Sequence, residues 1–115
     1  MAEFLSADWF RTINEALANA VTDAASSWRV VFEWADGPSS QTHAMTLSCV
    51  KGKSEISAGD HIAADALVTM SYADANSLAN GTLDVAEALR TGRFKVRGDA
   101  RAVIDMANAL RAAFA

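Results

Sequence analysis

Residues 71–115 contain three helix starts and one short strand, and their order limits what this chain can fold into more than any other feature. Each helix start has a short polar residue whose side chain can accept hydrogen bonds from the first free N–H groups of the helix. Two of the helices are followed by glycine, the residue that most readily ends a helix. The caps are Ser71, Asp84 and Asp99, and the glycines are Gly81 and Gly92. The pattern predicts two short helices, a strand at 93–97 and a final helix at 100–114.

The first third of the chain changes from helical to alternating periodicity. An apolar stripe preceded by Ser6 predicts a helix at 7–25. The stripe consists of Trp9, Ile13, Leu17, Ala20, Val21 and Ala24, widened by Phe10. Strict alternation then predicts a half-buried strand at 28–34. Its apolar face carries Trp28, Val30, Phe32 and Trp34, and its other face carries Arg29, Val31 and Glu33.

Three more strands are predicted before the first short helix, at 41–50, 54–58 and 66–70. The second strand would place His43 on one face with Met45, Leu47 and Cys49. The third directs Ile56 inward after a tight turn at Lys51-Gly52-Lys53, and the fourth alternates Ala66, Val68 and Met70. The apolar side of the final helix is predicted to be Val103, Ala107, Leu110 and Phe114, joined by Ile104 and Met106.

Helices grouped beside a run of strands indicate a two-layer α+β fold. We expect a five-stranded, mainly antiparallel sheet covered on one face by helices. A strand that follows a helical excursion can join an earlier strand by a crossover, so a mixed sheet stays open. The length of 115 residues predicts a single domain, 1–115.

Composition excludes several classes of function. A net charge of −4 and a pI near 5.0 argue against nucleic acid and allow at most transient contact with a membrane surface. Cys49 is the only cysteine, so no intrachain disulfide forms, and a reducing compartment is expected. The N-terminus lacks the pattern of a signal peptide, and no apolar run approaches the ~20 residues of a membrane span. We therefore expect a cytoplasmic protein.

The residues that could support catalysis do not form a recognisable constellation. His43 and Cys49 are six positions apart, about 20 Å along an extended strand, too far for a nucleophile and its base. His61 beside Asp60 lies in a polar connection, and two histidines without ligand spacing do not make a metal site. We predict no catalytic residue, no metal and no cofactor.

Several short motifs occur in an order that resembles the sterol carrier protein type 2 domain family over nearly the whole chain. The resemblance rests on Asp36-Gly37-Pro38, Lys51-Gly52-Lys53, Ala64-Asp65-Ala66, Val68-Thr69-Met70, the segment 78–83 around Gly81, and Gly92, Phe94, Val96, Gly98 and Asp99 within 88–99. It implies a bacterial stand-alone member of a lipid-carrier family, with an apolar tunnel between sheet and helices. It also implies non-catalytic binding of a fatty acid, acyl-coenzyme A, sterol or other lipid.

The ligand-binding hypothesis makes the inward-facing apolar residues candidate wall positions, although each could equally be plain core. The candidates are Phe32, Trp34, Met45, Leu47, Val68, Met70, Leu78, Leu83, Phe94, Val103, Met106, Ala107, Leu110 and Phe114.

Two alternatives stay open. The same cavity could serve an accessory enzyme or cyclase acting on a hydrophobic intermediate, with His43 or Tyr72 facing it. A homodimer or interaction module could instead cover the apolar face, with Trp28, Trp34 and Phe114 as anchors. The exposed basic stripe of Arg93, Lys95 and Arg97 is either a solvated face or a contact for acidic head groups.

Overall fold

The computed structural model describes residues 5–19, 27–37, 43–59, 63–79 and 83–113, and they contain the predicted elements in the predicted order. The elements are α1 (Ala7–Asn19), β1 (Trp28–Glu33), β2 (Ala44–Val50), β3 (Lys53–Ala58), β4 (Ala66–Thr69), α2 (Tyr72–Ala79), α3 (Val85–Arg90), β5 (Lys95–Gly98) and α4 (Ala100–Ala113).

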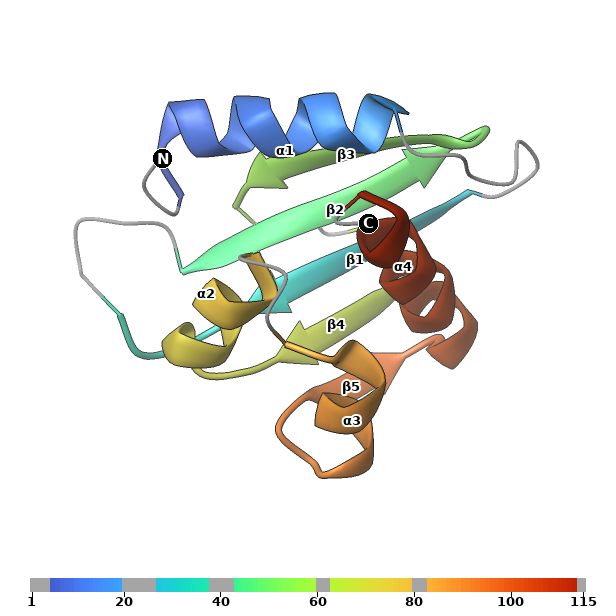
Figure 1. Cartoon of the computed structure of the whole chain (residues 1–115). Coiled ribbons are helices and arrows are strands. Elements are labelled where there is room, and N and C mark those ends of the chain that lie inside the picture. The colour runs from blue at the N-terminus through green and yellow to red at the C-terminus, as the bar shows by residue number, and fades with distance from the viewer. Residues whose placement is uncertain (1–4, 20–26, 38–42, 60–62, 80–82, 114–115) are drawn as a thin grey trace.

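The five strands form one mixed sheet in the order β3-β2-β1-β4-β5. All neighbours are antiparallel except β1 and β4, which are parallel because the chain crosses the sheet between β3 and β4. Figure 1 shows α1, α2 and α4 on the same face of the sheet, with α3 beside β5. The predicted α+β architecture, mainly antiparallel and covered on one face, is confirmed.

The helix caps predicted from the sequence are present. The Ser6 and Ser71 hydroxyls accept the N–H groups of Trp9 and Asp74, both at 3.1 Å. The Asp84 carboxylate accepts the N–H groups of Ala86 and Glu87, and the Asp99 carboxylate accepts that of Arg101 at 2.8 Å. These bonds satisfy donors that a helix start would otherwise leave without a partner.

The strand faces were predicted correctly with one exception. Val31 was placed outward beside Arg29 and Glu33, but it is buried. Its cross-strand partner Thr46 is also buried and donates its hydroxyl to the Gly59 carbonyl at 2.8 Å, so Gly59, directly after β3, lies beside this part of the outer face.

Three further details differ from the prediction. The fifth strand is Lys95–Gly98, because the Phe94 N–H donates to the Ala88 carbonyl at the end of α3 and the ladder with β4 begins only afterwards. Ile104 is 54% exposed, since it lies about 100° around α4 from the buried Val103.

His43 precedes β2 and is exposed, so it does not share the buried face of Met45. The predicted features at 20–25, 41–42, Gly81 and Phe114 lie outside the described residues.

Two groups of the motifs that carried the family resemblance form junctions between elements. Asp65 donates its N–H to the Arg29 carbonyl, accepts the Arg29 N–H on its carboxylate and accepts the Asp99 N–H on its carbonyl. Beside it, Gly98 has φ +101°, and a Cβ there would lie 2.5 Å from the Asp65 carbonyl oxygen. Only glycine therefore fits where β4, β5 and α4 meet.

The second junction joins the end of β1 to the start of α2. The Asp36 carboxylate accepts the Tyr72 N–H at 2.9 Å, and Gly37 packs so closely against the Tyr72 ring that no side chain fits. Asp36-Gly37 and Gly98-Asp99 thus fix where α2 and α4 begin above the sheet.

The free edge of β3 is covered by a side chain of α1. The Asn14 amide donates to the Ile56 carbonyl at 3.0 Å, and its oxygen accepts the Ile56 N–H at 2.7 Å. One asparagine thus satisfies both backbone groups that an edge strand exposes, and it sets the position of α1 along the sheet.

Gly98→Ala should lower the free energy of unfolding by roughly 3 kcal/mol or more, because the new methyl group meets backbone and the positive φ is strained. Gly92→Ala is the matched control: Gly92 has φ +80° but nothing within 4 Å of a Cβ, so only the conformational cost of about 1 kcal/mol is expected. Urea unfolding measures both. Equal losses in the two variants would contradict the close approach at Gly98.

Asn14→Ala should destabilise the protein by roughly 1–3 kcal/mol, because it leaves the N–H and C=O of the buried Ile56 without partners. Glu15→Ala, at the next and exposed position of the same helix, is the control and should change stability by less than about 0.5 kcal/mol. Chemical denaturation compares the two, and an Asn14→Ala protein as stable as the Glu15→Ala protein would rule out the edge-covering role.

Candidate ligand-binding site

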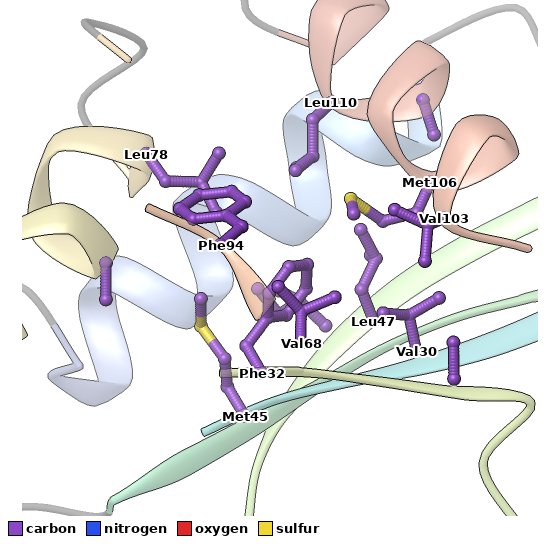
Figure 2. Close-up of a cluster of buried hydrophobic side chains, with 14 of the residues drawn as sticks. Val30, Phe32, Met45, Leu47, Val68, Leu78, Phe94, Val103, Met106 and Leu110 are labelled. Carbon is purple, nitrogen blue, oxygen red and sulfur yellow. The ribbon is translucent and has the colours of Figure 1, made fainter. Parts of the chain in front are cut away.

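A cavity lies between the inner face of the sheet and the helices α1, α2 and α4. Every described side chain that lines it is apolar, and the lining comes from six different elements. The lining residues are Trp9 and Ile13 of α1, Phe32 of β1, Met45 of β2, Ile56 of β3, Leu78 of α2 and Leu110 of α4. Figure 2 shows four of them, Phe32, Met45, Leu78 and Leu110, within the cluster of buried side chains.

The cavity is small in this conformation. Its volume is about 10 Å³, close to the space that one water molecule occupies. Pockets that hold small organic ligands measure roughly 300–1,000 Å³. A lipid can therefore enter only if wall residues move, and the structure shows a small apolar gap where the family resemblance implies a tunnel.

The structure brings part of the predicted wall together. Phe32, Met45, Leu78 and Leu110 line the cavity. Most of the other candidates are buried in the surrounding core, namely Trp34, Leu47, Val68, Met70, Phe94, Val103 and Met106. Leu83 and Ala107 are half-buried, and Phe114 lies outside the described residues.

Three residues that line the cavity were not among the predicted wall positions: Trp9, Ile13 and Ile56. Their apolar periodicity correctly predicted that all three face inward. Periodicity could not predict that α1 lies along the edge of β3, where Asn14 holds it. The inward faces of α1 and β3 consequently meet at the cavity.

The described residues that were considered for catalysis are not brought together, and Asp60 and His61 lie outside the described residues. His43 is exposed at the start of β2, whereas Cys49 is buried near its end. Tyr72 is half-buried, with its ring 6.3 Å from that of Trp34 in an edge arrangement. Within the ranges that the structure describes, no group of three or more His, Cys, Asp or Glu side chains could hold a metal ion.

Two of the anchors suggested for a dimer interface belong to the protein's own core. Trp28 and Trp34 are only 6% and 1% exposed, so neither is available at the surface. This part of the dimer hypothesis is wrong. Among the described helices, none is both long enough and apolar enough to cross a bilayer.

Comparison with known proteins agrees with this geometry. The profile of the SCP-2 sterol transfer family matches residues 10–111. This range contains all five strands and all four helices of the described residues, apart from the first residues of α1 and the last residues of α4. A search among curated proteins found no significant match.

Solved structures with the same fold include carriers and one enzyme. A crystal structure of sterol carrier protein 2 has a TM-score of 0.69 and 18% identity, with 97% of this chain and 98% of that chain covered. The solution structure of palmitated SCP2L2 from Aedes aegypti has a TM-score of 0.61 and 21% identity, with 87% of this chain and 92% of that chain covered.

The enzyme is the sec-alkyl sulfatase PisA1 from Pseudomonas sp., with a TM-score of 0.64 and 18% identity. The match covers 91% of this chain but only 16% of the sulfatase, so the shared fold is one part of a larger protein. At these identities the structural matches show the fold alone, whereas the family profile spans most of the sequence: the chain belongs to the SCP-2 sterol transfer family.

Proposed function

We propose that the chain binds and carries a hydrophobic ligand without chemically changing it, in the cavity between the sheet and α1, α2 and α4. The observation that carries the proposal is the composition of the cavity wall, which contains seven apolar side chains and no polar one among the described residues. Such a wall can exclude water from an acyl chain or a ring system, but apolar side chains neither transfer a proton nor attack a substrate. Membership of a sterol transfer family supports this reading.

The small volume of the cavity is compatible with carriage if its wall can be displaced at low cost. Met45, Leu78 and Leu110 are unbranched at Cβ and have several rotamers, unlike the β-branched Ile13 and Ile56. A ligand that moves them replaces protein–protein contacts by protein–ligand contacts, so dispersion energy is largely conserved. The cavity found here is therefore the position from which a larger pocket would open.

The expected affinity is moderate. Burying ten methylenes contributes ~8 kcal/mol gross at about 0.8 kcal/mol each. Loss of translational and rotational freedom costs roughly 4–15 kcal/mol, and displacing the wall adds to that cost. Ten buried methylenes therefore leave at most about 4 kcal/mol, which corresponds to millimolar binding, and micromolar affinity requires about fifteen buried methylenes. Affinity should thus depend on the apolar size of the ligand. A fatty acid, an acyl-coenzyme A, a sterol and other lipids all fit the proposal.

The setting that we propose is a stand-alone bacterial module in the cytoplasm. The lone and buried Cys49 is compatible with a reducing compartment. A ligand of this kind would be collected from a membrane by transient contact, with no part of the protein inserted permanently.

Denaturing the protein purified from cells and analysing the extract by lipid mass spectrometry would test the proposal. A co-purifying lipid in a fixed ratio to protein, together with saturable binding of a fluorescent fatty acid, is the expected result. A protein that is empty after purification and shows no saturable binding would contradict it.

Affinity should rise with ligand length across saturated fatty acids from 8 to 16 carbons, by up to about fourfold per methylene where each added group is fully buried. Isothermal titration measures the series, with the matching alcohols as a control for the head group. Because the described lining of the cavity has no polar side chain, acid and alcohol of one length should bind within about one order of magnitude of each other. An affinity that does not change with chain length would argue against an apolar pocket.

Leu78→Phe should weaken fatty-acid binding by about tenfold or more, because the larger ring takes the space that opens at the cavity. Leu89→Phe is the control, since Leu89 packs half-buried against the core from α3 but does not line the cavity. Both proteins are to be compared by titration after thermal melts confirm folding. Equal affinity in the two variants would place the ligand elsewhere.

A further inference from the structure

The cavity wall has one weakly anchored member, the helix α2. Within the described part of α2, only Ala75 and Leu78 are buried. The other two helices of the wall are held by larger apolar sets: Trp9, Ile13 and Leu17 in α1, and Ala102, Val103, Met106, Ala109 and Leu110 in α4. A segment with few buried apolar contacts is the cheapest to displace, so α2 is the element of the wall that opens first.

Polar contacts hold the first turn of α2 in place. Its first N–H, that of Tyr72, donates to the Asp36 carboxylate, and the Ser71 hydroxyl accepts the Asp74 N–H. Both contacts involve the backbone at the start of the helix, and they can persist while the far end of α2 tilts. The Asp36–Tyr72 contact, which joins α2 to another element, defines a pivot at the first residue of the helix.

A third contact ties α2 to another part of the chain. The Asp74 carboxylate forms an ion pair with the Arg93 guanidinium, which comes from the segment between α3 and β5. The Asp74 side chain is only 13% exposed, whereas that of Arg93 is 52% exposed. Arg93 is fixed at its base, because the next residue, Phe94, is buried in the core.

The position of this ion pair relates it to the cavity. Asp74 and Leu78 are four residues apart and therefore lie on the same face of α2, one turn from each other. In the described part of α2, Leu78 is the residue that lines the cavity. Tilting α2 about Tyr72 would withdraw Leu78 and would also move the Asp74 carboxylate, which lies two residues beyond the pivot, away from Arg93.

We propose that the Asp74–Arg93 ion pair is a latch that holds α2 over the cavity, and that ligand entry requires it to break. The proposal rests on the function proposed above and names the element that controls access to the site. The latch is exposed on the arginine side, so salt and anionic groups at a lipid surface weaken it. Opening would then be favoured where an acidic lipid head group competes for Arg93.

The test uses the full chain and stopped-flow binding of a fluorescent 16-carbon fatty acid. Asp74→Asn, Arg93→Gln and the double variant should each accelerate association by about fivefold, and the double variant should be no faster than the single ones, because all three remove the same pair. Arg93→Lys keeps the charge and should stay near the wild-type rate. Arg90→Gln removes an exposed cation that pairs with Glu87 at 3.9 Å within α3, and it should have no effect.

A second readout does not depend on any ligand. Hydrogen exchange of the α2 amide groups should be faster by about fivefold in Asp74→Asn and Arg93→Gln than in the wild type, with exchange in α1 unchanged. Raising the salt concentration should narrow the difference between wild type and variants in both measurements.

The outcomes separate the latch from the function. Saturable binding at one common rate in all variants, with unchanged exchange in α2, would overturn the latch and leave the carrier function standing. Absence of binding in every protein, the wild type included, would overturn the carrier function, and the exchange data alone would then decide whether α2 is latched. Accelerations that add in the double variant would show two separate effects and would also overturn the latch.

Discussion

The structure depends on the burial of one face of its sheet. Alternate residues of β1, β2 and β4 send large apolar side chains to the same side, and Phe32, Leu47 and Val68 are fully buried there. This face can be covered only by helices that carry a matching apolar stripe. How closely these helices pack on the sheet determines whether any space remains between them. In the conformation described here the helices nearly fill it, and a gap of about 10 Å³ is left.

Polar contacts set the positions of the covering helices, and each involves a different kind of junction. Asn14 attaches α1 to the edge of β3, Asp36 receives the start of α2, and Asp65 with Gly98 fixes where α4 leaves β5. Hydrogen bonds of this type add modest stability, but leaving their buried groups without partners is costly. They therefore specify one arrangement of helices, while the apolar contacts supply most of the free energy.

Much of the fold could be predicted from the sequence because local signals agreed with one another. The cap residues marked the helix starts and alternation marked the strands. A tight turn was predicted at Lys51-Gly52-Lys53, and the positive φ values of Lys51 and Gly52 make it a two-residue hairpin turn. The misplaced residues depend on contacts with other elements. Val31 pairs with the buried Thr46, whose hydroxyl donates to the Gly59 carbonyl, and β5 begins late because the Phe94 N–H donates to Ala88 of α3. Periodicity carries no information about such contacts.

The candidate site was predictable as a set of inward-facing residues and not as a cavity. Sequence periodicity cannot distinguish a wall residue from a core residue, because both face inward and both are apolar. The difference depends on how far apart two elements are held, which Asn14 and Asp36 decide from outside the cavity. The contribution of α1 and β3 to the wall, through Trp9, Ile13 and Ile56, became visible only with the position of α1.

We propose that a guest molecule enters the apolar gap between the sheet and α1, α2 and α4. The most direct measurement is nuclear Overhauser contact between the methylene protons of a ¹³C-labelled palmitate and the methyl groups of the protein. If palmitate occupies the gap, we expect its methylene protons to show Overhauser contacts with Ile13, Met45, Leu78 and Leu110, and we expect these contacts to saturate at one bound ligand per protein. Contacts confined to the exposed Val50 and Ile104, or no contacts at all, would contradict it.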